Sequence, residues 1–126
     1  MKVLQMISSA YRATFEEQDD TVLWLTQAMK NAGGELDVFL TGNAVNYAVR
    51  GQDASGLSFG GWKQTQPPRI EDDLARMTTK GIAVYALADD LVERGLSDVT
   101  LVPGVRRIQR GDIARLMNGY DQVWRW

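Results

Sequence analysis

The chain of 126 residues has 14 basic and 16 acidic side chains, a net charge of −2, and neither cysteine nor histidine. These two absences exclude disulfides, thiol catalysis, histidine general bases and transition-metal sites of the usual Cys/His kind. The slight negative charge and the lack of an apolar run of roughly 20 residues predict one cytoplasmic domain, residues 1–126, that binds neither nucleic acid nor membranes.

Two short apolar runs near the start of the chain predict strands, over residues 2–7 and residues 36–40. Between them, Thr14 and Glu17 have the spacing of a capping box, in which Thr14 accepts from the Glu17 backbone N–H and the Glu17 side chain reaches back. This motif and the apolar stripe that follows it predict a helix over residues 15–32.

A second helix is predicted over residues 44–50. Asn43 is a favourable N-cap residue, and Gly51 can adopt the left-handed conformation that ends a helix. Apolar runs that alternate with glycine-terminated helices are typical of a parallel sheet covered on both faces. The predicted fold class is therefore α/β, a three-layer α/β/α sandwich with a five-stranded, mostly parallel sheet.

Residues 52–69 interrupt this alternation. They contain three glycines and two prolines and are too long for an ordinary connection. Their large apolar residues are Leu57, Phe59 and Trp62. Loops of this length are typically either functional or disordered, so two interpretations stay open. The segment is a lid or subunit-contact loop anchored by these three side chains, or it is a flexible surface insertion.

The strongest strand signal is the apolar run over residues 82–88, which predicts a central strand buried on both faces. A helix over residues 70–80 precedes it. Asp89 and Asp90 follow the strand directly and are predicted to cap a short helix that begins at Leu91. Ligands of open α/β sheets bind at the carboxyl ends of the strands, so we expect the functional edge at this polar corner.

Two further strands complete the predicted sheet, over residues 99–102 and residues 120–126. Between them, Asp112 is expected to cap a helix over residues 113–118. The last strand includes two tryptophans at the end of the chain. Their large apolar area favours contact with a neighbouring subunit, and the alternative is packing within one subunit.

The corners after parallel strands converge at one edge of a sheet, so their polar side chains can share a pocket. The candidates for ligand binding are Ser8, Ser9, Tyr11, Arg12, Thr41, Asn43 and Asp90. Asp89 and Asp90 are also candidates for catalysis, as oxygen ligands of a divalent cation or as an acid and base pair. Helix capping explains both aspartates without any reaction.

Three arginines, Arg106, Arg107 and Arg110, are candidates for an anion site. Their guanidinium groups can grip phosphate, sulfate or the carboxylates of a partner. The alternative is salt bridging to surface acidic residues. The glycine motifs of dinucleotide-binding and P-loop proteins do not occur, so we expect no cofactor.

Short, mostly apolar motifs are spread over nearly the whole chain. They lie at residues 1–4, 38–45, 94–96, 101–105 and 122–126. With the central strand and its polar corner, they resemble the DsrE/DsrF-like family of sulfur-relay proteins. The resemblance implies a compact α/β subunit that forms homo-oligomers, often trimers or hexamers, and whose catalytic members carry a persulfide on a cysteine in this corner. That cysteine would fall at Leu87 or Asp90, so the chain is identified as a cysteine-less member, and Leu87 joins the ligand-binding candidates.

Three functions stay open. The chain is a DsrE-like homo-oligomer that acts as a non-catalytic binding or scaffold protein for a small molecule or a protein partner. Alternatively, it is an enzyme that uses Asp89 or Asp90, with or without a divalent metal. In the third interpretation it is a structural oligomer without a small-molecule site. The first is preferred because the resemblance spans the chain while the reactive residue is absent.

Overall fold

The computed structural model describes residues 1–11 and 20–126, and its centre is a five-stranded parallel sheet. The strands of this sheet are β1 (Lys2–Ile7), β2 (Glu35–Leu40), β5 (Val84–Leu87), β6 (Arg106–Ile108) and β7 (Gln122–Arg125). They lie in the order β6-β5-β2-β1-β7, and each neighbouring pair is parallel. The central strands β1 and β2 are thus paired on both sides, as their nearly continuous apolar sequences require.

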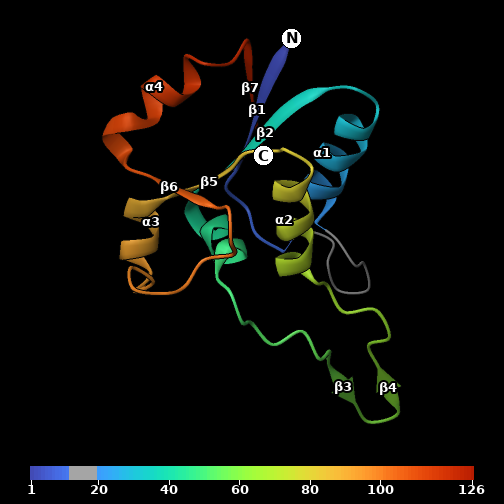
Figure 1. Ribbon diagram of the computed structural model, residues 1–126. Coiled ribbons are helices and arrows are strands. Elements are labelled where there is room, and N and C mark those ends of the chain that lie inside the picture. The colour runs from blue at the N-terminus through green and yellow to red at the C-terminus, as the bar shows by residue number, and fades with distance from the viewer. Residues whose placement is uncertain (12–19) are drawn as a thin grey trace.

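Helices cover both faces of this sheet. The helical segments are α1 (Thr21–Asn31), α2 (Ile70–Thr79), α3 (Ala88–Glu93) and α4 (Ile113–Met117), with 3-10 turns η1 (Gly42–Ala48) and η2 (Arg110–Asp112). Figure 1 shows α1 and α2 beside one face and α3 and α4 toward the other. The predicted three-layer α/β/α class is confirmed. Among the described helices, none is both long enough and apolar enough to cross a membrane.

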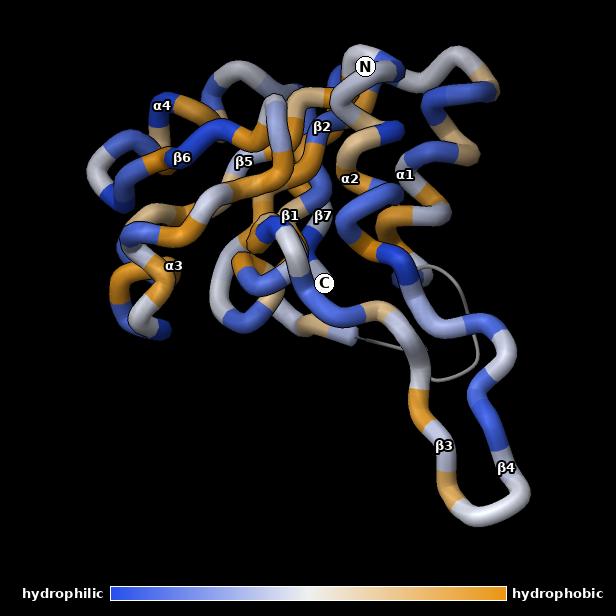
Figure 2. The backbone as a smooth tube through the Cα atoms, turned by 60° about the horizontal axis from the view of Figure 1, so that its bottom comes forward, coloured by the Kyte–Doolittle hydropathy of each residue, from blue (hydrophilic) through white to orange (hydrophobic). Residues whose placement is uncertain are grey.

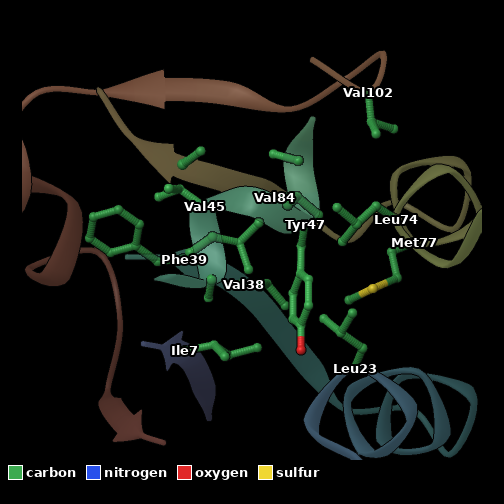
Figure 3. Packing of buried hydrophobic residues seen from close by; sticks show 14 of the residues in the cluster. Ile7, Leu23, Val38, Phe39, Val45, Tyr47, Leu74, Met77, Val84 and Val102 are labelled. Atoms are coloured by element: carbon green, nitrogen blue, oxygen red, sulfur yellow. The ribbon is translucent and has the colours of Figure 1, made fainter. Parts of the chain in front are cut away.

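The core lies on both sides of β2, because successive side chains of a strand point to opposite faces. Val38 and Phe39 are fully buried in this way, and Figure 3 shows them on opposite sides of the strand. On the Val38 side, Leu23 of α1 and Met77 of α2 pack around Tyr47 of η1. The hydroxyl of Tyr47 points toward α1. This arrangement places η1 between the helix layer and the end of the sheet.

The prediction of a fourth strand over residues 99–102 is wrong, because the fourth strand is β6. The Val102 N–H donates to the Ala48 carbonyl oxygen at 2.8 Å, and Leu101 makes only an isolated antiparallel bridge with Val49. This apolar run is therefore buried against the end of η1 instead of pairing in the sheet. The sequence did not predict β6, because two of its three residues are arginines and the segment therefore lacks an apolar pattern. An edge strand tolerates such charged residues.

Two predicted helix starts are also wrong. Asn43 lies inside η1 and makes no cap. Asp89 and Asp90 lie in the first turn of α3, which begins at Ala88 and has no side-chain cap. Both aspartates bond to other segments of the chain, so tertiary contacts replaced the local hydrogen bonds that capping would supply.

Two further caps differ from the prediction. Asp112 occupies the cap position of α4, but its side chain accepts from Arg115 at 3.2 Å and caps no backbone N–H. The helix expected to begin at residue 15 has its described start at Thr21, with Asp20 as N-cap residue. The predicted capping box of Thr14 and Glu17 lies outside the described residues.

Residues 52–69, where no regular element was predicted, contain a short antiparallel hairpin. Its strands are β3 (Ser58–Phe59) and β4 (Trp62–Lys63). Figures 1 and 2 show that the hairpin projects from the body of the molecule, beyond the end of α2. The two interpretations of this segment, as a contact element or as a surface insertion, therefore both apply to this hairpin.

Candidate functional site

The candidate site is the corner where β1, β2 and β5 end, and Asp90 and Gly42 hold it together. The Gly42 N–H donates to Asp90 Oδ2 at 2.6 Å, which joins the start of η1 to α3. Gly42 has φ +52°, and a Cβ at this position would lie 3.2 Å from the Ser8 carbonyl oxygen. Only glycine fits this conformation and close approach without strain. The three strand ends therefore meet through backbone contacts and one carboxylate.

Arg94 forms a second connection between α3 and η1. Its Nε and Nη2 donate to Asn43 Oδ1 at 3.2 and 3.0 Å, and its Nη1 donates to the Asp90 carbonyl oxygen at 3.2 Å. Asn43 is thus an acceptor for a guanidinium group and not a helix cap. Sequence reasoning missed Arg94 because nothing local to the Arg-Gly-Leu motif indicates a partner 51 residues away.

Asp89 and Arg110 lie on the outer side of this corner. Asp89 Oδ1 accepts from the Arg110 backbone N–H at 2.8 Å, and the Arg110 side chain lies 3.9 Å from Asp89 Oδ2 and 3.5 Å from Asp90 Oδ1. A hollow of about 370 Å³ opens here, lined by Ala88, Asp89, Val92, Glu93, Gln109 and Arg110. The Arg110 side chain is 60% exposed, so these ion pairs contribute little stability and remain open to competition from a ligand.

The remaining candidates at the strand ends have structural partners. The Ser8 hydroxyl donates to the Trp126 carbonyl oxygen at 2.8 Å, and the Thr41 hydroxyl lies 3.4 Å from the Ile7 carbonyl oxygen. Thr41 and Leu87 are buried, whereas Ser8 and Ser9 are exposed. Arg12 lies outside the described residues. The structure thus brings Asn43, Asp89 and Asp90 together at the corner and leaves Leu87 beneath the surface.

Tyr11 lies on another side of the corner, in an unusual backbone conformation. It is the one described residue other than glycine with a positive φ, at 59°. Its N–H donates to the Tyr47 hydroxyl oxygen, its own hydroxyl lies 3.2 Å from Gln52 Oε1, and its ring meets the Tyr47 ring edge-on at 5.0 Å. The Tyr47 hydroxyl in turn donates to Asp20 Oδ2 at 2.6 Å. A buried Asp20–Tyr47 pair therefore fixes the backbone of Tyr11.

The three arginines proposed for an anion site do not converge. Arg106 lies over the Tyr85 ring, 5.9 Å from its centre, and Arg107 donates to the Val99 carbonyl oxygen at 3.0 Å. Arg106 and Arg107 are successive residues of β6, so their side chains leave opposite faces of the sheet. Arg110 pairs instead with the aspartates of the corner. Among the described residues, no group of three or more acidic side chains is placed to hold a metal ion.

The Trp126 side chain has a partner within its own subunit. Its Nε1 donates to Gln5 Oε1 at 2.7 Å, while Gln5 itself is fully buried and its Nε2 has no hydrogen-bond partner in the described structure. Trp126 keeps 36% of its surface exposed. The bond anchors the indole on β1, and the predicted subunit contact of the tryptophans stays a prediction.

Comparison with known proteins assigns this chain to a family. The DsrE/DsrF-like family model matches residues 1–124, and the chain belongs to this family. The YchN protein of E. coli has a similar structure, with a TM-score of 0.73 and 21% identity over 100% of both chains. MTH1491 of Methanobacterium thermoautotrophicum, a protein of unknown function, superimposes with a TM-score of 0.65 and 18% identity over 99% of this chain and 98% of that one. At these identities the two structures show a shared fold alone. No curated protein matches the chain.

Two tyrosines, the buried Tyr47 and the half-buried Tyr120, predict a loss of stability at alkaline pH. The Tyr47 and Tyr120 hydroxyls are removed from water and donate to Asp20 and Asp37, and burial and these carboxylates raise the pKa of both phenols above the ordinary value of 10.0. The unfolded chain therefore releases these protons at a lower pH than the native chain. Hence we expect the free energy of unfolding to fall as pH rises above about 10.

Urea midpoints measured between about pH 8 and 11 test this expectation. The Tyr47→Phe/Tyr120→Phe double variant is the control, because it removes both phenols and leaves every other side chain in place. Its midpoint is expected to fall less steeply with pH than that of the wild type. Equal slopes for the two proteins would contradict the assignment.

Proposed function

We propose that this protein is a homo-oligomeric, non-catalytic binding or scaffold member of the DsrE/DsrF-like family, working in the cytoplasm, and that it transfers no sulfur itself. The proposal rests on which residues occupy the corner. Persulfide chemistry needs a thiol, and the chain has no cysteine. Leu87, one of the two positions where the family resemblance implies a cysteine, is 4% exposed, and Asp90, the other, bonds to Gly42 and Arg110.

The hollow beside α3 supports a binding role. Its walls include the apolar side chains of Ala88 and Val92, and its polar groups include both a guanidinium and carboxylates. Such a mixed surface can hold a small polar molecule or a segment of a protein partner. The ligand would compete with the exposed ion pairs of Arg110 and leave the buried contact between Asp90 and Gly42 in place.

The alternative function, an enzyme that uses Asp89 or Asp90, has less support. Each carboxylate accepts from a backbone N–H of another segment, Asp89 from Arg110 and Asp90 from Gly42. These bonds explain the residue types without a reaction. A general base must in addition reach the proton that it abstracts, and Asp90 is 8% exposed.

Incubation with a persulfide donor tests the proposal directly. We expect the denatured wild-type chain to show no mass gain of a sulfur atom, because no side chain can form a persulfide. The matched control is a Leu87→Cys variant, and an Asp90→Cys variant samples the second implied position. Sulfur gained by either cysteine variant and not by the wild type would show that the corner is accessible to the donor. Sulfur retained by the wild-type chain would contradict the proposal.

A further inference from the structure

The helix α4 ends at the one Asn-Gly sequence of the chain, Asn118-Gly119. Asn118 is the C-cap residue of α4, and Gly119 begins the connection to β7. Both residues are exposed. Figure 1 shows α4 at the edge of the molecule, with a loop that leads from it to β7. This junction is therefore accessible to solvent.

An asparagine followed by glycine lies beside a backbone nucleophile. The Gly119 nitrogen can attack Cγ of the Asn118 side-chain amide and form a cyclic succinimide. The bond from Cγ to the amide nitrogen breaks, and this nitrogen leaves as ammonia with the proton of the attacking N–H. Water from the solvent then opens the ring at either carbonyl and gives aspartate or isoaspartate. Glycine favours ring closure because it has no Cβ to crowd the attacking nitrogen.

The native backbone of the junction opposes this reaction. Asn118 has helical dihedral angles, with φ −62° and ψ −17°. The Gly119 N–H donates to the Leu116 carbonyl oxygen at 3.1 Å. The succinimide ring fixes ψ outside the helical range, so Gly119 must first release Leu116. Ring closure therefore requires the end of α4 to open.

Opening this end of α4 costs little free energy. The helix spans five residues, and none of them is buried. A helix of this length is not stable by itself in water. The Asn118 side chain makes no hydrogen bond to another residue that the structure describes. Segments with few buried contacts open locally while the rest of the fold persists, so the reactive geometry is reached without unfolding of the sheet.

Asn31 provides a matched comparison within the same chain. It is the last residue of α1, it is exposed, and Ala32 follows it. Asn31 and Asn118 thus both lie at exposed helix ends and differ in the residue that follows. Asn43 and Asn46 lie inside η1, and the side chain of each is hydrogen-bonded.

We propose that Asn118-Gly119 is a site of spontaneous deamidation, at which local opening of α4 converts Asn118 into a mixture of aspartate and isoaspartate. The reaction needs water and no other reagent. It lowers the net charge of the chain by one from −2. The inference does not depend on the oligomer or on the ligand of the proposed function.

The modification weakens the attachment of β7. The new carboxylate lies at the C-terminal end of α4, where negative charge opposes the helix dipole. Isoaspartate also directs the backbone through the side chain and lengthens it by one methylene group. The next two residues anchor this part of the chain. The Tyr120 hydroxyl donates to Asp37 at 2.6 Å, and Asp121 exchanges two hydrogen bonds with Lys2, at 2.7 and 2.8 Å.

Ageing of the purified full-length protein at mildly alkaline pH, followed by peptide mapping, tests the site. The amide-to-acid mass change is expected about tenfold faster at Asn118 than at Asn31, because Gly119 leaves the attacking nitrogen uncrowded. A protein isoaspartyl methyltransferase is expected to label the peptide that contains residue 118. Denaturing urea is expected to accelerate the change at Asn118, because it removes the bond to Leu116.

Two variants serve as controls. Gly119→Ala adds a Cβ that would lie 3.3 Å from the Leu116 carbonyl oxygen, and it is expected to slow deamidation of Asn118 to about the rate at Asn31. Asn118→Gln keeps both the glycine and a side-chain amide, and it is expected to abolish the rapid phase because its longer side chain closes a larger ring.

Asn118→Asp separates the effect of charge from that of the longer backbone. Isoaspartyl protein, isolated after ageing, is expected to have a lower urea midpoint than Asn118→Asp, which in turn lies below the unmodified chain. Equal rates at Asn118 and Asn31 would overturn the proposal, as would an unchanged rate in Gly119→Ala. Deamidation of Asn118 in urea but not in the folded protein would also overturn it, since α4 would then not open.

Discussion

Replacing Asp20 by alanine is expected to lower the free energy of unfolding by about 3 kcal/mol or more, from the lost helix cap and the lost bond to a charged acceptor. Asp20 is fully buried. Its Oδ1 accepts from the Val22 N–H at 2.8 Å, and its Oδ2 accepts from the Tyr47 hydroxyl at 2.6 Å. Alanine leaves both donors buried without a partner, which costs more than the bonds contribute. Urea unfolding of the purified variant measures the loss.

Two further variants separate the parts of this effect. Asp20→Asn keeps an oxygen for the cap and is expected to cost less than Asp20→Ala. Tyr47→Phe removes the hydroxyl and retains the cap, and its cost and that of Asp20→Ala are expected not to add in the double variant, because they share one bond. Simple additivity would show that the Asp20–Tyr47 pair does not act as a unit.

Replacing Asp90 by alanine is expected to cost about 2 kcal/mol, because the Gly42 N–H loses a charged acceptor at the corner. The bond length is 2.6 Å, and Asp90 is 8% exposed. Asp90→Asn retains an oxygen that can accept from Gly42 and is expected to recover most of the loss. Asp89→Ala is the matched control. The Asp89 carboxylate accepts from the more exposed backbone N–H of Arg110, so its removal is expected to cost less stability than the removal of Asp90.

The same three variants distinguish a structural role of the corner from a catalytic one. If Asp90 acts by holding Gly42, the asparagine variant restores stability together with any ligand affinity. If Asp90 acts as a base or a metal ligand, asparagine should abolish function as completely as alanine while remaining stable. That second pattern would favour the enzyme and contradict the binding role.

The sequence predicted the strands of the sheet well because burial on both faces leaves a local signal. The apolar runs of β1, β2 and β5 are short, each of the first two is interrupted by a single polar residue, and all are bounded by polar or glycine residues. α2 was predicted for a similar reason, since its buried residues Ile70, Leu74 and Met77 recur at helical spacing. The run at residues 99–102 misled the prediction because burial against η1 and burial in a sheet give the same apolar pattern.

The capping predictions failed for a different reason. Asn43, Asp89 and Asp90 are residue types that favour helix starts, but each bonds to a segment that lies far away in the sequence. A side chain with several available donors takes the ones that the fold brings to it, and local spacing does not contain that information. For the same reason Arg94 and Tyr47 carried no signal that marked them as part of the corner.

The sequence by itself determined the class of the sheet, the location of the polar corner after β5 and the absence of thiol chemistry, because burial patterns and composition are local properties. Only the tertiary structure decided which groups meet in that corner. It separated Arg106 and Arg107 to opposite faces of β6, joined Asp90 to Gly42, and extended the hairpin of β3 and β4 away from the body. These features depend on contacts between residues far apart in the chain, whose geometry arises only when the layers pack.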